Sequence, residues 1–262
     1  MSIIFYSTGL TSSTRKTNDV IGKIFTVFKV PSYFIRRKKE SSGVVSYIER
    51  SVKEGDVVFN IGVKEDHYLC IIRRKLGKSG RIIAFESGPY LLKQLANRKK
   101  ILRWKNVELE TLILSDFSYS RTAYNYSGTS FQNSSTGAII INLKDDERDY
   151  VRHKINIDTL DNYCDNNNIH PSFLKIDAGG AELEILKGAI NVLKTYKPKI
   201  LLKCEERLAG AIKVMETFEY LRQLDYSGCF VLDTIRIPIV NFDFNLYQNA
   251  HNNFYCNNFM FE

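Results

Sequence analysis

The most constraining feature of the sequence is a stretch in which an apolar strand pattern runs directly into a helical pattern. Residues 173–176 read as a buried strand, Asp177 follows, and a helical pattern begins at Glu182 after two glycines. Ligands of parallel α/β sheets bind at the edge formed by the carboxyl ends of the strands, so Asp177 is expected at a ligand-binding edge. The alternative is an ordinary strand-to-helix turn in which Asp177 caps the helix.

A second segment of the same form lies upstream. Residues 57–62 read as a buried strand ending at a glycine, 67–76 as a helix, and 81–86 as a further strand that ends in Glu86. Glu86 lies roughly two dozen residues past the first glycine turn, where ribose-binding acids lie in dinucleotide folds. This order of strand, glycine turn, helix, strand and acid predicts a nucleoside-binding α/β fold.

The rest of the chain continues the alternation of strands and helices. The predicted elements are a helix at 89–102, strands at 107–114 and 173–177, a helix at 182–196, a strand at 199–204, a helix near 215–225, and strands at 229–233 and 254–261. Two strands without an intervening helix therefore end the sheet. This ending disfavours a nicotinamide dehydrogenase, which usually adds another crossover half and whose full Gly-x-Gly-x-x-Gly turn the sequence lacks.

Several short motifs occur in the same order as in a known family. Five of them are Phe59-Asn60-Ile61-Gly62, Ala84-Phe85-Glu86-Ser87, Leu114-Ser115-Asp116, Thr159-Leu160-Asp161 and Lys175-Ile176-Asp177-Ala178-Gly179-Gly180-Ala181-Glu182. The C-terminal part adds Pro198-Lys199-Ile200-Leu201-Leu202, Glu205-Glu206-Arg207 and Tyr255-Cys256-Asn257-Asn258-Phe259. From about Gly43 onward, the chain resembles the FkbM family of S-adenosylmethionine-dependent methyltransferases. The resemblance implies a seven-stranded Rossmann-like methyltransferase sheet whose last strand is antiparallel.

The resemblance also implies a function and a set of site residues. It implies an O-methyltransferase that uses S-adenosylmethionine as its cofactor and acts on a hydroxyl of a sugar, a glycan or a secondary metabolite. The cofactor-binding candidates are Asn60, Gly62, Lys64, Glu86, Ser115 and Asp116. Asp177 is the first candidate for orienting or deprotonating the acceptor, Glu205 and His153 are further catalytic candidates, and Glu182 is expected to cap its helix.

Three positions depart from the family pattern. Asn60 stands where the pattern has Asp, Asp66 where it has a second glycine, and Gly179 where it has Glu. An amide oxygen still accepts a hydrogen bond but carries no charge for an ammonium, so Asn60 predicts roughly tenfold weaker cofactor binding. Asp66 is compatible with an N-cap, with Lys64 as a replacement cation. The alternative reading is a catalytically degenerate protein that keeps the fold for binding or assembly.

Composition limits the partners and the compartment. The 262 residues carry a formal net charge of +8, but the cations form short clusters, among them 73–75 and 98–100, which are expected to be solvated helix faces. No nucleic-acid-binding motif accompanies them, so the expected partner is a small-molecule or glycan acceptor. Five scattered cysteines and four scattered histidines indicate neither disulfides nor a metal site. With no apolar run long enough to span a bilayer and no signal pattern, the expected location is the cytoplasm.

Two segments fall outside the predicted alternation. Residues 1–45 contain an amphipathic piece and a basic cluster and are expected to form an extension or cap on a methyltransferase-like domain at 46–262. Residues 116–138 form a polar insertion, expected to be a mobile lid or a short hairpin. Tyr124, Tyr126 and Ser130 are its candidate acceptor contacts.

Overall fold

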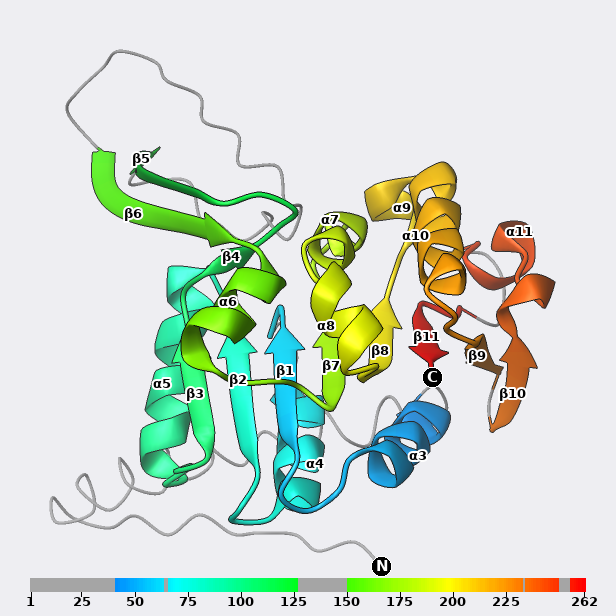
Figure 1. Ribbon diagram of the computed structural model, residues 1–262, viewed down its shortest axis with the longest axis horizontal. Helices are drawn as coiled ribbons and strands as arrows, with labels where there is room; N and C mark the ends of the chain where they lie inside the picture. Colours follow the sequence, from blue (N-terminus) through cyan, green and yellow to red (C-terminus); the bar gives the residue numbers. More distant parts are fainter. Residues whose placement is uncertain (1–40, 64–65, 127–149, 233, 250–254) are drawn as a thin grey trace, which may run out of the picture. The chain divides into compact units, whose positions relative to one another are not determined.

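The computed structural model describes residues 41–63, 66–126, 150–232, 234–249 and 255–262 (Figure 1). Residues 1–40 of the expected extension, Lys64 and residues 127–138 of the expected insertion lie outside the described residues. Helix α3 (Ser41–Ser51) buries Val44, Tyr47 and Ile48 against the sheet, so the expected boundary at 45/46 falls inside this helix.

The centre of the described fold is one mostly parallel sheet with the strand order β10-β9-β11-β8-β7-β1-β2-β3. Its strands are β1 (Val57–Ile61), β2 (Arg81–Phe85), β3 (Val107–Glu110), β7 (Phe173–Ile176), β8 (Lys199–Lys203), β9 (Gly228–Leu232), β10 (Ile235–Pro238) and β11 (Asn258–Phe261). Strand β11 lies antiparallel between β8 and β9. The Rossmann-like fold with a final antiparallel strand is thus confirmed. Strand β10, paired antiparallel with β9, is an additional edge strand that the sequence patterns did not predict.

The central strands form because their residues are apolar on both faces, as expected for a parallel sheet covered by helices on both sides. In β1, Val58, Phe59, Asn60 and Ile61 are all buried. The register pairs Asn60 with Ala84 of β2 and with Lys175 of β7. Two polar residues, Asn60 and Lys175, therefore lie side by side in the interior of adjacent strands.

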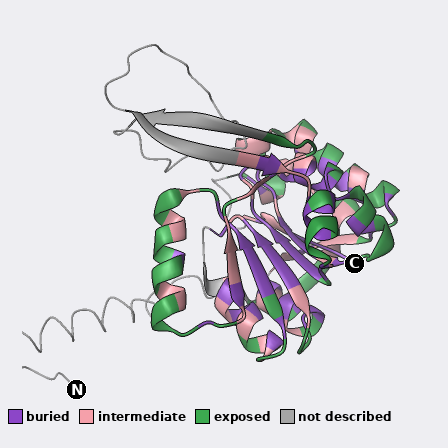
Figure 2. Ribbon diagram, turned by 60° about the vertical axis from the view of Figure 1, so that its left-hand side comes forward, coloured by how far each residue is buried: buried purple, intermediate pink, exposed green. Residues whose placement is uncertain are grey.

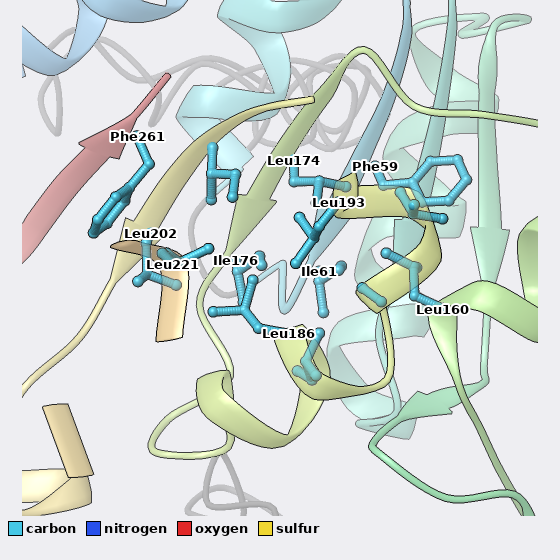
Figure 3. Close-up of a cluster of buried hydrophobic side chains, with 14 of the residues drawn as sticks. Phe59, Ile61, Leu160, Leu174, Ile176, Leu186, Leu193, Leu202, Leu221 and Phe261 are labelled. Atoms are coloured by element: carbon cyan, nitrogen blue, oxygen red, sulfur yellow. The ribbon is translucent and has the colours of Figure 1, made fainter. Parts of the chain in front are cut away.

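Two hydrophobic cores cover the faces of the sheet. The helices are α4 (Asp66–Leu76), α5 (Pro89–Ile101), α6 (Leu160–Asn167), α7 (Glu182–Lys187), α8 (Ile190–Thr195), α9 (Glu206–Ala209), α10 (Ala211–Gln223), the 3-10 helix η2 (Ile239–Asn241) and α11 (Phe244–Tyr247). One core joins α3, α4 and α5 to the sheet. The other joins α6, α7, α8 and α10 to the opposite face, and Figure 3 labels several of its members, among them Phe59, Leu160 and Leu186.

The helix predicted at 182–196 is divided into α7 and α8 at Gly188. A Cβ atom at Gly188 would lie 2.0 Å from the backbone oxygen of Ser115, so the chain passes too close for a side chain. The carboxylate of Asp161 then accepts hydrogen bonds from the backbone N–H groups of Asn191 and Val192, both at 2.9 Å, at the start of α8. Asp161, on α6, thus caps a helix that is not its own.

The strand predicted at 107–114 is also divided. Its second part, β4 (Ile113–Leu114), joins a separate three-stranded sheet with the order β4-β6-β5. In that sheet, β5 (Tyr119–Tyr126) pairs antiparallel with β6 (Tyr150–Asp158) along its full length. The two strands form the ribbon that extends beyond the central sheet in Figure 1. The first part of the insertion predicted at 116–138 therefore forms strand β5 of a two-stranded antiparallel ribbon.

Candidate functional site

The turn after β1 is built around Gly62. Its φ is +74°, in the left-handed region that favours glycine, and a Cβ atom there would lie 2.0 Å from the backbone oxygen of Asp177. The ammonium of Lys175 donates a hydrogen bond to the backbone oxygen of Gly62 at 2.9 Å. The first glycine turn and the end of β7 are therefore held in direct contact, and only glycine fits between them.

Glu86 lies on the other side of the same turn. Its carboxylate accepts hydrogen bonds from the backbone N–H groups of Val63 at 3.2 Å and Gly88 at 2.7 Å, and the residue is 9% exposed. The carboxylate thus links the turn after β1 to the turn after β2. This is the position expected of an acid that meets a ribose beside the first turn.

Asn60 is the residue of this edge whose polar atoms are least satisfied. It is 1% exposed, and neither its amide oxygen nor its amide nitrogen has a hydrogen-bond partner within the described part of the chain. Leaving a buried amide unpaired costs about 1 to 3 kcal/mol, so a partner for it is expected from a ligand. The unpaired amide, the side-chain-free turn at Gly62 and the fixed carboxylate of Glu86 fit the methionine and ribose ends of S-adenosylmethionine.

Asp177 and Glu205 are brought together at the ends of β7 and β8. The ammonium of Lys203 lies 3.3 Å from the carboxylate of Asp177 and 3.6 Å from that of Glu205, and Lys175 lies 3.7 Å from Asp177. Arg207 and the hydroxyl of Tyr255 also donate hydrogen bonds to the carboxylate of Glu205. The result is a charge network in which two buried carboxylates share a lysine.

This network fixes the ionisation of Glu205. Burial acts to raise the pKa of its carboxyl, but the hydrogen bond from Arg207 and the charges of Lys203 and Arg207 outweigh burial, and the pKa lies below its usual range. Glu205 is therefore a carboxylate at neutral pH.

Glu182 stabilises the loop that precedes its helix. Its carboxylate accepts hydrogen bonds from the backbone N–H groups of Ala178 and Gly180, and burial raises its pKa. Gly179, at a position where the family pattern has Glu, has a φ of +64°. The loop between β7 and α7 thus combines left-handed backbone with a carboxylate that satisfies its amides.

The other predicted site residues lie in different places. The hydroxyl of Ser115 donates a hydrogen bond to the carboxylate of Asp116, and the Ser115 backbone N–H donates one to the backbone oxygen of Asp158, so both residues belong to the turn after β4. His153 lies in the middle of β6, roughly 16 Å along the strand from Asp158 at its end, and its side chain lies outside the described residues. Of the predicted site residues, Asn60, Gly62, Glu86, Asp177 and Glu205 thus lie together at the ends of β1, β2, β7 and β8.

Sequence reasoning missed the cations of this site. Lys175, Lys203 and Arg207 all contact the carboxylates of Asp177 or Glu205. A signal for them was present, because Lys-x-acid triplets occur at 175–177 and 203–205, at the ends of neighbouring strands. Within the described residues, neither a group of three or more potential metal ligands nor a helix long and apolar enough to cross a membrane is found.

Comparisons with known proteins identify the family and the fold. The family model of the methyltransferase FkbM domain matches residues 56–227. The solved methyltransferase FkbM of Methylobacillus flagellatus KT is 13% identical with a TM-score of 0.51, and the match covers 83% of this chain but only 50% of that one. The present chain thus spans about half the length of that protein.

Two further solved structures match less closely. A SAM-dependent O-methyltransferase of Thermotoga maritima is 14% identical with a TM-score of 0.42, covering 84% of this chain and 64% of that one. Fibrillarin of Aeropyrum pernix, solved with natively bound S-adenosyl-L-methionine, is 10% identical with a TM-score of 0.45, covering 80% and 67%. No curated protein matches the sequence. On the family match over most of its length, the chain belongs to the FkbM family of S-adenosylmethionine-dependent methyltransferases.

Proposed function

We propose that this protein transfers the methyl group of S-adenosylmethionine to a hydroxyl of a sugar, a glycan or a secondary metabolite. The observation that carries the proposal is the turn at Gly62 and Val63, which contacts Glu86 on one side and Asp177 on the other. Glu86, expected to bind the nucleoside of the cofactor, and Asp177, expected to contact the acceptor, thus both contact the same turn.

The chain's own groups suit this reaction. Bound S-adenosylmethionine supplies a methyl group already activated on a positively charged sulfur, so the protein needs mainly to orient the acceptor oxygen and accept its proton. Asp177, buried beside Gly62, is the residue proposed to accept a hydrogen bond from the acceptor hydroxyl and then its proton. Glu205, whose pKa is lowered by Arg207 and Lys203, is proposed to orient the acceptor as a permanent carboxylate.

The proposal includes a reducing compartment and an acceptor other than nucleic acid. All five cysteines are free thiols, which supports the cytoplasm as the location. The acceptor proposed is an uncharged hydroxyl, which can donate a hydrogen bond to the carboxylate of Asp177. His153 and the ribbon β5–β6 remain candidate acceptor contacts under this proposal.

The test measures cofactor binding and then methyl transfer. Thermal unfolding of the full chain with S-adenosylmethionine or its demethylated product, S-adenosylhomocysteine, is expected to show a saturable stabilisation of about 2.7 kcal/mol at 100 times the dissociation constant. Transfer of a radiolabelled methyl group to a panel of hydroxylated acceptors follows, with Asp177→Asn as the variant expected to bind cofactor but lose turnover. Stabilisation by neither ligand would favour the degenerate binding protein, for which Asn60 and Asp66 are the motivating substitutions.

A further inference from the structure

Cations gather at the edge of the sheet opposite to the candidate site. In a parallel βαβ unit the helix runs back against its strands, so helices α4 and α5 both end at the edge where the strands begin. The last turn of α4 carries Arg73, Arg74 and Lys75, and that of α5 carries Arg98, Lys99 and Lys100. Cations there offset the negative ends of the helix dipoles, and the topology brings the two groups to one edge.

Contacts join the two helix ends into one surface. The guanidinium of Arg73 lies 5.6 Å from the ring centroid of Trp104, just after α5. The side-chain amide of Asn106 donates a hydrogen bond to the backbone oxygen of Gly77 at 2.8 Å, beside Lys78. These contacts link the ends of α4 and α5, which carry the clusters at 73–75 and 98–100.

Along the sequence, the charge of residues 73–105 is one-sided, and acids from outside this segment, Glu54 beside Gly77 and Glu108 beside Arg81, border it. Residues 73–105 contain eleven Lys and Arg but one acidic residue, Glu86, which lies at the candidate site. The whole chain has a net charge of +8, so the remaining residues are net acidic. Of these cations, Arg74 is paired with Glu49 and Arg81 with Glu108 on the border of the surface. Helix dipoles account for the cations in the last turns but not for Lys78, Arg103 or Lys105.

Two large aliphatic side chains are exposed within the same surface. Ile101 is 60% exposed and Leu102 is 41% exposed, directly between Lys100 and Arg103. Figure 2 shows α5 coloured mainly as exposed or intermediate, and Leu95 is its buried residue. Two exposed aliphatic side chains flanked by cations suit a boundary between lipid headgroups and acyl chains.

We propose that this amino-edge basic surface, formed by Arg73, Arg74, Lys75, Lys78, Lys99, Lys100, Arg103 and Lys105 around Ile101 and Leu102, docks the protein on a membrane rich in anionic phospholipid. Phosphate headgroups match the cations, and the two aliphatic side chains enter the interface. A nucleic-acid backbone matches the cations alone and gives the aliphatic pair no partner. Docking by this edge leaves the opposite edge, with Gly62, Glu86 and Asp177, accessible from the aqueous side.

The test is co-sedimentation of the full chain with phosphatidylcholine vesicles that contain or lack phosphatidylglycerol. We expect binding only to the anionic vesicles, and weaker binding as salt is raised. Lys100→Ala/Lys105→Ala, which removes two exposed charges, should weaken binding about thirtyfold. The matched control is Lys187→Ala/Lys194→Ala, two exposed lysines on α7 and α8 across the sheet, and it should bind as the unmodified chain does.

A second variant separates lipid from other polyanions. Ile101→Ser/Leu102→Ser keeps every charge, so it should lose several-fold in vesicle binding but leave binding to a duplex RNA unchanged. Thermal unfolding and S-adenosylhomocysteine binding of each variant check that the fold is intact. Equal binding to neutral vesicles, no vesicle binding, or vesicle binding unaffected by both surface variants would overturn the proposal.

Discussion

Glu86 shows how one side chain joins two turns of the candidate site. Its carboxylate already accepts hydrogen bonds from the backbone N–H groups of Val63 and Gly88, so its position is fixed before any ligand binds. Preorganised acceptors cost little to align when a ribose hydroxyl binds. Its value for binding therefore depends on contacts within the protein as much as on contact with the ligand.

Replacing Glu86 by Ala is expected to weaken binding of S-adenosylmethionine by roughly 1 to 3 kcal/mol. The ribose hydroxyls would lose their hydrogen-bond acceptor, and the backbone N–H groups of Val63 and Gly88 would lose the carboxylate that orders the two turns. Isothermal titration calorimetry with S-adenosylhomocysteine measures the loss. Glu108→Ala removes a carboxylate from the neighbouring strand β3, where it pairs with Arg81, and serves as the control. Retained affinity in Glu86→Ala would place the ribose elsewhere.

Asn60 is one of the three positions that depart from the family pattern, and it lies at the candidate cofactor site. Its amide is buried without a partner in the described structure, and its strand neighbour in register is the buried Lys175. A carboxylate at this position would have Lys175 as a neighbour and, in the proposed cofactor site, would pair with the ammonium of S-adenosylmethionine.

Asn60→Asp is therefore expected to tighten S-adenosylmethionine binding by about tenfold. Asn97→Asp, which adds the same charge on the exposed part of α5, controls for the change in net charge and should leave affinity as it is. An affinity that is unchanged or undetectable in Asn60→Asp would show that the residue does not contact the cofactor.

The break between α7 and α8 illustrates packing at the scale of elements. Gly188 has an ordinary helical φ of −74°, so the absence of a side chain there is required by Ser115 rather than by backbone conformation. The same close approach positions the turn after β4, which carries Ser115 and Asp116. One glycine therefore sets both the end of a helix and the location of two predicted cofactor residues.

Gly188→Ala is expected to destabilise the protein by about 1 to 3 kcal/mol, because the added methyl group meets a backbone oxygen that cannot rotate away. Chemical denaturation gives the free energy of unfolding. Asn191→Ala, an exposed change near the start of α8, is the comparison and should cost under about 0.5 kcal/mol. Equal stabilities of the two variants would mean that the turn at Ser115 shifts freely.

Elements with strong local signals were predictable and those fixed by distant contacts were not. The apolar runs of β1, β2, β7 and β8 and the helix at α5, which starts at Pro89, follow from local pattern. The division at Gly188 depends on Ser115, more than 70 residues away, and β10 depends on pairing with β9. In the candidate site, Gly62, Glu86 and Asp177 could be predicted because each directly follows an apolar strand pattern. The contact of Lys203 with Asp177 could not, because it depends on the pairing of β7 with β8.

At the scale of the whole molecule, the network around Glu205 couples stability to pH. The pKa of Glu205 is lower in the folded protein than in the unfolded chain, where it is near 4.5. The ionised carboxylate therefore stabilises the fold fully at pH values above the pKa of the unfolded chain. That stabilisation is lost as the pH falls through the lower, folded pKa. The hydrogen bonds from Arg207 and Tyr255 to Glu205 join α9 and the segment before β11 to the end of β8, so the loss loosens several elements together.

Glu205→Gln should lower the free energy of unfolding at pH 7 by about 1 to 2 kcal/mol and make it less dependent on pH below about 5. Urea denaturation at a series of pH values from 7 to 3 measures both effects. Glu216→Gln, an exposed carboxylate on α10, provides the reference profile. A Glu205→Gln profile parallel to that of the unmodified protein would show that the network does not govern acid stability.

The position of β11 has a consequence for how the protein is made. The strand follows β9 and β10 in the chain, yet it lies between β8 and β9 in the sheet and pairs with both. On the ribosome, the hairpin of β9 and β10 therefore emerges with no strand to join, and its docking has to wait until β11 has left the exit tunnel. The half of the sheet from β3 to β8 can assemble earlier, so a nascent chain stalled before Asn258 exposes an unpaired edge at β8 to chaperones.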